Sequence, residues 1–516
     1  MYSSRLTAFA ILGSLFLFSC HSGKHEVVRE DALSTFGTYV YALDTLQMTQ
    51  AMEQIISADT SRRAADRAVR KYYQEKERFE DAPLWFTRMG VTSDADTLLA
   101  CLRREAPCNG LDTLAFFVPQ IAADLSIVRS LAFDSLGVNI NELLPRLDFH
   151  LTKAYVRYTT GQHYGFVRPD RLLNHLYMKP DSSGYAHLFD YEVAPPDYGE
   201  ALQHLTADDR DDYLRLGQPS SPVFRALQNR LLSSVSADER RLLALNMERS
   251  RWQVTQPEEL DRKVVVNIPA QQLWAIGPDS LLSMRICCGA KSTKTPLLIS
   301  QISHVQVNPE WVIPFNIVKT DVARHGGDSA YFARNRYDII DRQTGDTLNP
   351  QHVSPAQLCS GRLRVSQKGG PGNSLGRIVF RFQNNFSVYL HDTNNPAAFK
   401  RERRTLSHGC VRVEYPFELA CFLMPDMDEA TLDKLRISMD IEPLSDEGRT
   451  YLEEHTDDSQ PHRLISYRKL SPPVPVYLIY YTAYPNPETG EVEHWPDVYG
   501  YDAAIRQEMH YYLLKE

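Results

Sequence analysis

Residues 387–413 of this chain read SVYLHDTNNPAAFKRERRTLSHGCVRV, and this stretch carries most of the functional information. An apolar segment ends at His391, and after 15 intervening residues comes Ser407-His408-Gly409-Cys410-Val411-Arg412. A cysteine becomes a useful nucleophile only when a base or a positive field favours its thiolate. The pattern therefore predicts a cysteine acyltransferase in which Cys410 is the nucleophile and His391 is the general base.

Two strands are predicted immediately before this motif. Ile378–Phe382 and Phe386–His391 are rich in β-branched and aromatic residues, and the Gln-Asn-Asn segment between them indicates a hairpin. Because side chains alternate along a strand, Tyr389 and His391 share the face opposite to the apolar side chains. We expect the apolar face to be buried and His391 to end the strand on the open face.

The residues next to Cys410 have several possible roles. His408 could assist Cys410, bind substrate or hold the loop. Gly409 indicates a tight backbone with exposed amides, which a core position would not require. Ser407 is expected to cap or orient the loop, and Arg412 to pair with a carboxylate either of the substrate or of the protein.

Two plainer interpretations compete with catalysis at this motif. Free cysteines are commonly buried for packing, so Cys410 could be a core residue. A zinc site built from His391, His408 and Cys410 is the other alternative, but no CxxC pair or carboxylate cluster completes it. We therefore expect neither a metal nor another cofactor.

The composition limits the classes of partner. At 516 residues the chain is long enough for about three domains, and 43% apolar content supports buried cores. The net charge of −9 argues against nucleic acid as a partner. A neutral polymer, or a polymer of mixed charge, is favoured over nucleic acid as the partner.

The N-terminus has the pattern of a targeting segment. Arg5 precedes a mostly apolar run, Leu6–Phe18, which is too short to span a bilayer. Leu17-Phe18-Ser19-Cys20 resembles a lipobox, which predicts a signal peptide over 1–20 and lipidation of Cys20; the alternative is an ordinary signal peptide with an incidental cysteine. We expect an exported, lipid-anchored protein facing the periplasm, with the outer membrane favoured.

Seven cysteines follow Cys20, so an oxidising compartment leaves at least one thiol unpaired. Cys101 and Cys108 could close a small loop. Cys287 and Cys288 are adjacent in a strand-like segment, where opposite, buried positions are expected rather than a bridge. The cysteine count permits a free thiol at Cys410.

The pattern along the chain predicts a multidomain α+β protein. A tether over 21–33 leads to an all-α scaffold over 34–258, followed by a β-rich domain over 262–445 and a C-terminal segment over 446–516 that packs on the other two. A loop-rich segment over 319–376 interrupts the β-rich domain. The main expected elements after the scaffold are strands at Lys263–Ile268, Leu281–Cys288, Leu297–Val307 and Val474–Tyr481, and a helix at Pro416–Met424.

The His391-x15-Ser407-His408-Gly409-Cys410-Val411-Arg412 pattern resembles the signature of the L,D-transpeptidase (YkuD-type) catalytic domain. The likeness covers most of residues 60–510 and is strongest to the large periplasmic subgroup with a helical scaffold. Further segments that carry it are Pro83-Leu84-Trp85, Leu147–Thr152, Thr295-Pro296, Asn308–Pro314, Gly370–Gly376, Tyr389–Thr393 and Tyr499–Asp502. Two features depart from the family: no separate peptidoglycan-binding module is recognisable, and the lipobox replaces other anchors.

The resemblance implies a reaction on peptidoglycan stem peptides, which would be both donor and acceptor. Cys410 would attack a tetrapeptide stem and form an acyl-enzyme, with backbone N–H groups around Gly409 and Cys410 as the oxyanion hole. Asp392 could orient the imidazole, and the 319–376 segment could cap the site. Candidate substrate contacts are Trp311, Tyr389, Arg404 and Arg412, although packing explains Trp311 equally well.

Other outcomes of the same chemistry stay open. The acyl-enzyme could be transferred to a second stem as a 3→3 cross-link, hydrolysed as in an L,D-carboxypeptidase, or used to attach or detach a wall protein. A sortase would need a distant arginine, and a papain-like peptidase places its cysteine before its histidine. The non-enzymatic alternative is a wall-binding lipoprotein with a dead site.

Overall fold

The structure is a computed structural model of the whole chain. It describes residues 35–36, 39–40, 43–76, 83–87, 90–176, 188–207, 209–233, 235–256, 261–456 and 462–514. The predicted signal peptide, Cys20 and the tether over 21–33 lie outside the described residues. None of the described helices is both long enough and apolar enough to cross a membrane.

Contacts divide the chain into two compact units, each described here by itself. The helical unit comprises the described residues within 1–104, 113–160 and 197–218, and the strand-rich unit comprises those within 105–112, 161–196 and 219–516. The division falls inside the helices α4 (Ser93–Cys108) and α7 (Ile140–Tyr164). The main change from helix to strand lies between α12, which ends at Arg251, and β6, which begins at Lys263, and residues 219–256 pack with the strands rather than with the first helices.

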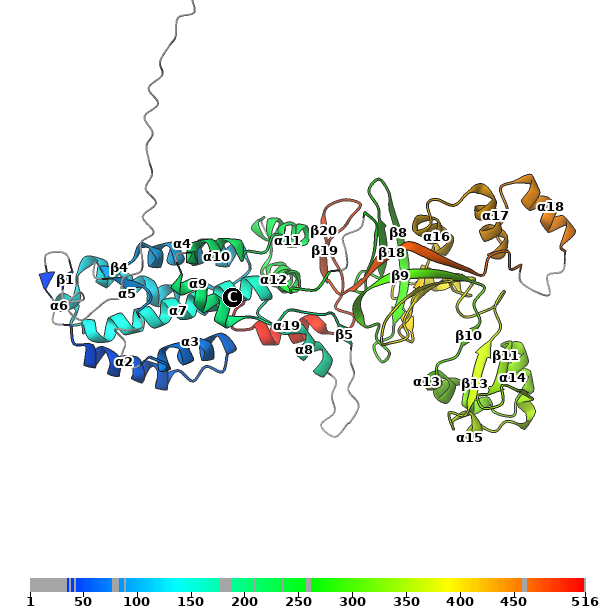
Figure 1. Cartoon of the computed structure of the whole chain (residues 1–516), viewed down its shortest axis with the longest axis horizontal. Helices are drawn as coiled ribbons and strands as arrows, with labels where there is room; N and C mark the ends of the chain where they lie inside the picture. Colours follow the sequence, from blue (N-terminus) through cyan, green and yellow to red (C-terminus); the bar gives the residue numbers. More distant parts are fainter. Residues whose placement is uncertain are drawn as a thin grey trace, which may run out of the picture. The chain divides into compact units, whose positions relative to one another are not determined.

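The helical unit is built around a buried carboxylate on α7. Asp148 accepts hydrogen bonds from the backbone N–H groups of Leu84 (3.1 Å) and Trp85 (3.0 Å) and from the Tyr73 hydroxyl (2.5 Å). The Trp85 indole donates to Thr152 Oγ1 at 3.0 Å. The loop around Trp85 is thereby fixed to α7, which explains why this tryptophan is buried. The helices around α7 are α2 (Thr45–Ala58), α3 (Ala64–Gln74), α5 (Val118–Ser130), α9 (Tyr198–Thr206) and α10 (Arg210–Leu216), coloured blue to green in Figure 1.

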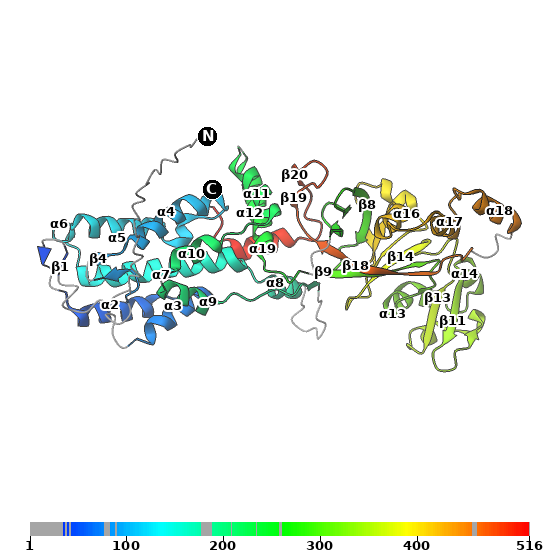
Figure 2. The ribbon, with the colours of Figure 1, turned by 45° about the horizontal axis from the view of Figure 1, so that its top comes forward.

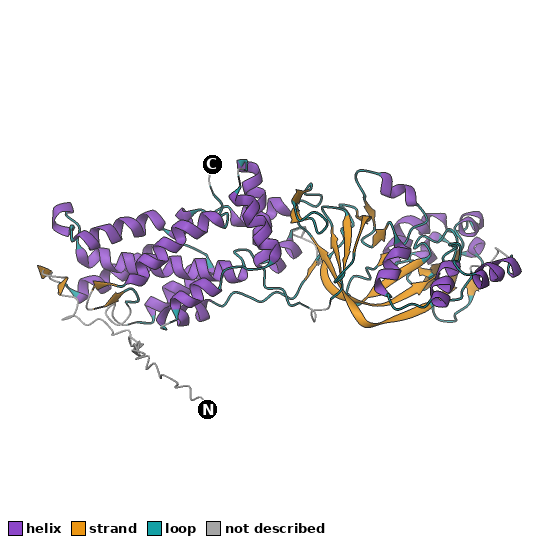
Figure 3. Ribbon diagram, turned by 90° about the horizontal axis from the view of Figure 1, so that it is seen from above, coloured by secondary structure: helices purple, strands orange, loops and turns teal. Residues whose placement is uncertain are grey.

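A ten-stranded sheet forms the centre of the strand-rich unit (Figure 3). Its strands are β5 (Phe189–Asp190), β6 (Lys263–Asn267), β7 (Gln272–Ile276), β8 (Leu281–Gly289), β9 (Leu297–Val307), β14 (Ile378–Phe382), β15 (Leu390–His391), β16 (Thr405–Ser407), β17 (Val411–Val413) and β18 (Tyr467–Ile479). The order is β14-β15-β17-β8-β7-β6-β18-β9-β5, and β14 also pairs with β9, so most of the sheet closes on itself. β16 pairs with β8 in parallel.

The composition of the central strands follows from their burial. β6 reads KVVVN and pairs in parallel with β18, where Val264 lies opposite Val476. The last four residues of β6 are all buried, as expected for a strand covered on both faces. The predicted α+β fold class, with helices followed by a β-rich domain, is confirmed.

The hairpin before the catalytic motif is shorter than predicted. β14 and β15 pair in antiparallel fashion, with Val379 opposite His391, but β15 includes only two residues. The Asn384 side chain accepts from the backbone N–H groups of Phe386 and Val388 at 3.0 Å each, and Ser387 has a φ of +55°. The expected strand over 386–389 is therefore replaced by a turn that the Asn384 side chain closes.

The segment expected to be loop-rich is a small subdomain, here called the cap (residues 311–367). Its sheet contains β10 (Trp311–Val312), β13 (Leu363–Gln367), β11 (Tyr337–Asp341) and β12 (Thr347–Leu348), with short helices α13 (Phe315–Ile317), η3 (Val318–Val322), α14 (Ser329–Arg334) and α15 (Pro355–Leu358). Phe332, Ile339 and Leu358 lie in a hydrophobic core of its own. These elements lie together in both Figure 1 and Figure 2.

Two helical elements complete the strand-rich unit. The predicted helix is observed as α16 (Pro416–Leu423), which begins with a proline and packs near β8. Near the end of the chain, α19 (Tyr501–Met509) contacts α12 (Ala237–Arg251) and α8 (Pro169–His175). The C-terminal segment is therefore part of this unit.

Candidate active site

Two adjacent strands bring the signature residues together. β15 and β17 pair in parallel, with Leu390 opposite Val411 and His391 opposite Arg412, and Val411 N–H donates to the Tyr389 carbonyl at 3.1 Å. In a parallel pair, aligned side chains lie on the same face and neighbours along a strand alternate. Since Leu390 and Val411 are fully buried on one face, Tyr389, His391 and Cys410 belong to the other.

Cys410 is a free, partly exposed thiol immediately before β17. Its Sγ lies 3.8 Å from the Ser387 carbonyl oxygen, to which it donates. Burial raises the pKa of the Cys410 thiol above its ordinary value, although contacts with Tyr389 and the charges of Arg381 and Arg412 lower it. The resting cysteine is therefore a protonated thiol that solvent can reach, not a sealed core residue.

His391 is more buried than predicted, with only 4% of its surface exposed. Its Nδ1 is buried and makes no hydrogen bond within the described residues. Burial lowers the pKa of His391 to about 3, and the positive charge of Arg412 adds to the effect, while the backbone of Asp392 and Leu375 opposes it. The imidazole is therefore neutral at neutral pH, which is the form that can accept a proton. A preformed thiolate–imidazolium pair is not favoured.

Tyr389 connects the nucleophile, the histidine and the cap. Its ring lies edge-on to the His391 ring with centroids 5.7 Å apart, and the Arg381 guanidinium lies 4.8 Å from its centroid. Burial raises the pKa of Tyr389 well above its ordinary value, and the Cys410 side chain raises it further. Trp311, which packs against the core of the cap, acts on the Tyr389 hydroxyl through a hydrogen bond. Tyr389 therefore borders the thiol, and Trp311 is linked to the site through its contact with Tyr389.

Hydrogen bonds fix the loop that carries the nucleophile. The Ser407 hydroxyl donates to the Cys410 carbonyl (2.5 Å) and accepts from Gly409 N–H (3.1 Å), so Ser407 orients the loop as expected. Gly409 has a φ of +121°, a conformation that favours glycine. Its N–H is bonded to Ser407 in this structure, so the expectation that Gly409 N–H lines an oxyanion hole stays a prediction. Cys410 N–H makes no hydrogen bond with any part of the chain that the structure describes, and it is the donor left for that role.

The remaining candidates separate into residues at the site and residues that support it. His408 Nε2 lies 3.5 Å from Asp321 Oδ2 of η3, so His408 connects the loop to the cap, and its assistance to Cys410 stays a prediction. The Asp392 carboxylate accepts from the N–H groups of Arg377 (2.7 Å) and Thr393 (2.6 Å). It is therefore the Asp392 backbone, rather than its side chain, that acts on the imidazole.

The two predicted arginine contacts differ in their environment. Arg404 donates to the backbone carbonyls of Ile286 (3.0 Å) and Gln271 (3.1 Å), so its guanidinium is occupied within the domain and does not support a contact with substrate. Arg412 lies opposite His391 in the strand register, and its buried Nε has no partner among the described residues. Arg412 thus remains a candidate for a carboxylate ligand. No cluster of ligating side chains that could hold a metal ion occurs in the described part of the chain.

Comparison with known proteins assigns families to two regions of the chain. Residues 261–431 match the family described as L,D-transpeptidase catalytic domain (YkuD), and residues 67–231 match a family described as Scaffold domain. The chain contains an L,D-transpeptidase catalytic domain. It is also 28% identical, over 381 residues, to a Haemophilus influenzae protein named "Putative L,D-transpeptidase", covering 71% of this chain and 72% of that protein. A transpeptidase type of function follows from the family.

The L,D-transpeptidase domain contains site residues that sequence reasoning did not single out. Arg381 lies over the Tyr389 ring, and Thr295 donates to the Gly409 carbonyl at 2.8 Å. In the sequence, Thr295 is noted only as part of a segment that resembles the family. Its hydrogen-bond partner, Gly409, is 114 residues away in the sequence. Only the folded sheet brings the two together, so no local signal could have assigned the contact. One cavity outlined by described residues lies elsewhere, beside Asp428 and Arg468, and contains none of the signature residues.

Proposed function

We propose that this protein is a peptidoglycan L,D-transpeptidase that forms 3→3 cross-links through an acyl-enzyme on Cys410. The observation that carries the proposal is the strand register that places a neutral, buried imidazole and a solvent-accessible thiol on one face of β15 and β17. The family match supplies the reaction type, and stem peptides are the substrates that this family implies.

In the first half-reaction, Cys410 Sγ bonds to the carbonyl carbon of the third residue of a tetrapeptide stem. The thiol proton passes to His391, and Cys410 N–H is the donor to the oxyanion. The C–N bond to the terminal D-alanine then breaks, and His391 returns the proton to the leaving amine. Because the pKa of His391 is about 3, its protonated form is short-lived and gives up the proton readily.

In the second half-reaction, the side-chain amine of an acceptor stem attacks the thioester. His391 takes a proton from that amine, the C–S bond breaks and the proton returns to Cys410. Tyr389 borders the thiol, Trp311 contacts Tyr389, and Arg412 offers an unpaired donor for a substrate carboxylate. The contact of the cap with the loop through Asp321 and His408 supports a role for the cap in excluding water from the thioester.

The test is incubation of the purified chain with disaccharide tetrapeptide, and separately with a carbapenem, followed by intact mass measurement and product analysis. We expect 3→3 dimers and a covalent adduct, both absent in Cys410→Ala. Release of D-alanine without dimers would instead identify an L,D-carboxypeptidase, and the absence of any adduct would identify a dead wall-binding protein. A His391→Ala variant should lose about 10²–10⁴-fold in acylation rate; full activity there would remove His391 as the base.

We also propose that the protein is lipidated on Cys20 and held at a membrane facing the periplasm. The support is the sequence of the lipobox alone. In a fractionated host, Cys20→Ala should move the chain from the membrane to the soluble fraction. An unchanged membrane fraction for this variant would contradict lipid anchoring.

A further inference from the structure

The peptide bond between Gly409 and Cys410 is the part of the nucleophile loop that the proposed chemistry needs to orient. The Gly409 carbonyl accepts a hydrogen bond from Thr295 Oγ1 at 2.8 Å. A trans peptide is planar, so its C=O and N–H groups point in opposite directions. Wherever the Thr295 hydroxyl holds the Gly409 oxygen, it also determines the direction of Cys410 N–H.

The direction of the Thr295 hydroxyl is itself fixed. Thr295 Oγ1 accepts from Gly289 N–H at 2.9 Å, so its single proton is committed to the Gly409 carbonyl. Thr295 is fully buried, and no part of its side chain is available to a substrate. Its contribution to a reaction would therefore act only through the peptide that it holds.

A second hydroxyl, that of Tyr499, fixes the strand ends on either side of Thr295. Tyr499 Oη donates to the Gly289 carbonyl at 2.7 Å and accepts from Thr295 N–H at 3.1 Å. The tyrosine is fully buried and comes from the C-terminal segment, far from β8 in sequence. It thus joins the end of β8 to the turn that carries Thr295.

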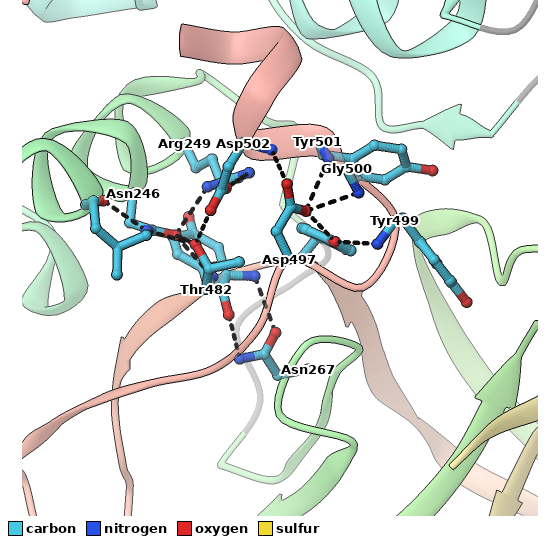
Figure 4. A network of polar contacts seen from close by, with 12 residues as sticks. Asn246, Arg249, Asn267, Thr482, Asp497, Tyr499, Gly500, Tyr501 and Asp502 are labelled. Atoms are coloured by element: carbon cyan, nitrogen blue, oxygen red, sulfur yellow. Dashed lines mark hydrogen bonds and ion pairs between the residues drawn. The ribbon is translucent and has the colours of Figure 1, made fainter. Parts of the chain in front are cut away.

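The C-terminal segment holds Tyr499 through a polar network (Figure 4). Tyr499 N–H donates to the Tyr480 hydroxyl at 2.8 Å, and this hydroxyl donates to Asp497 at 2.5 Å. Asp497 accepts the N–H groups at the start of α19, at 2.9–3.0 Å. Asp502 on α19 pairs with Arg249 of α12 at 2.6 Å. A continuous set of hydrogen bonds therefore runs from α12 and α19 to the nucleophile loop.

From this geometry we propose that Thr295 and Tyr499 are positioning residues of the transfer reaction, which set the direction of the Cys410 N–H toward the oxyanion. The proposal rests on the proposed function, because an oxyanion forms only if Cys410 is acylated. According to this proposal, the C-terminal segment acts through Tyr499 to keep the acylation of Cys410 fast, in addition to stabilising the fold.

Two reagents distinguish a variant that misorients the Cys410 N–H from a variant that changes the reactivity of the Cys410 thiol. A carbapenem passes through a tetrahedral oxyanion, whereas alkylation by iodoacetamide does not. In the full chain, Thr295→Val should lower the rate of carbapenem acylation about 10–100-fold and leave the alkylation rate of Cys410 within about 2-fold, since a misaligned donor loses most of its effect. Thr295→Ser retains the hydroxyl and should recover most of the rate, and Tyr499→Phe should show an intermediate loss.

Thr152→Val is the matched control. Thr152 is also a fully buried threonine whose hydroxyl is bonded, to the Asp148 carbonyl at 2.8 Å, but it belongs to the helical unit and not to the network that holds Tyr499. Its loss should lower the melting temperature without slowing acylation. Equal losses of acylation and alkylation in Thr295→Val, or a loss in Thr152→Val as large as in Thr295→Val, would overturn the positioning role. A wild-type chain that is alkylated but never acylated would instead overturn the proposed function itself.

Discussion

Burial decides the protonation states of the two central residues. It raises the pKa of the Cys410 thiol and lowers the pKa of the His391 imidazole, so both are neutral at neutral pH. Because Cys410 is not a thiolate at rest, its proton has to move to His391 while the bond between sulfur and the substrate carbon forms. The arginines near the site, Arg381 and Arg412, reduce the cost of the thiolate without making it the resting form.

The pH dependence of alkylation tests this charge assignment. Because the pKa of Cys410 lies above the ordinary thiol value, its alkylation by iodoacetamide should rise steadily as the pH increases through neutrality and beyond. The rate is measured by peptide mass mapping, with the exposed thiol of Cys359 as an internal reference. A plateau already reached below about pH 7 would instead indicate a preformed ion pair with His391.

Gly409 offers a second test at the level of one residue. A Cβ added there meets its nearest neighbour, the Lys294 carbonyl oxygen, at 3.6 Å, so space is available, but a φ of +121° strains any other residue by about 1–3 kcal/mol. Relaxation of that strain would rotate Cys410 N–H. Gly409→Ala should therefore reduce the acylation rate by at least about tenfold. Gly137→Ala, at another positive φ with open space and in the helical unit, should change stability alone.

At the scale of elements, the sequence predicted the regular strands better than the segments between them. The predicted strands that begin at Lys263, Leu297 and Ile378 are rich in β-branched residues, which suit burial in a closed sheet. The structure contains all three strands. The segment over 386–389 has the same composition, but hydrogen bonds of the Asn384 side chain override its strand preference. His391 is buried, and the backbone of Leu375, from a separate segment, acts on its imidazole; no local pattern in the sequence reveals this contact.

The cap shows why a loop-rich sequence can still form a compact element. Its strands are short and separated by turns, so no long periodic pattern marks them, yet they enclose Phe332 and Ile339 in a core of their own. Its contacts with the catalytic residues run through Trp311 and through Asp321. The cap can therefore loosen without disrupting the large sheet.

Truncation of the cap core tests this independence. Ile339→Ala removes a fully buried side chain and should destabilise the cap by about 2–5 kcal/mol. Hydrogen exchange should accelerate over residues 311–367 while β18 stays protected, and the products should shift from 3→3 dimers toward hydrolysed tripeptide. Gln351→Ala, at an exposed position of the cap, is the control. Uniformly faster exchange over the whole strand-rich unit would contradict an independent cap.

At the scale of the whole chain, the helical unit has a buried charge cluster of its own. Asp66 is fully buried and receives both Nε and Nη2 of Arg157 at 2.6 Å, with Lys153 Nζ at 3.7 Å. Burial raises the pKa of Asp66, but the hydrogen bonds and charges of Arg157 and Lys153 together hold it below its ordinary value of 3.8. The ionised carboxylate therefore stabilises the fold above about pH 3.8, and this contribution is lost as the pH falls through the lowered pKa.

Removing that charge tests whether the two units depend on each other. Asp66→Asn removes the negative charge that compensates the buried Arg157 and Lys153. It should lower the free energy of unfolding of the helical unit by about 3–5 kcal/mol near neutral pH. Asp212→Asn breaks an exposed pair with Arg215 in the same unit and should cost less than about 1 kcal/mol. Calorimetry should show the transition of the helical unit moving to lower temperature in Asp66→Asn, with the difference from wild type shrinking below about pH 3.8.

At temperatures below that transition, the rate of Cys410 acylation in Asp66→Asn should match the wild-type rate, because every contact assigned to the site lies within the strand-rich unit. A parallel fall in acylation would mean that the helical unit takes part in the reaction.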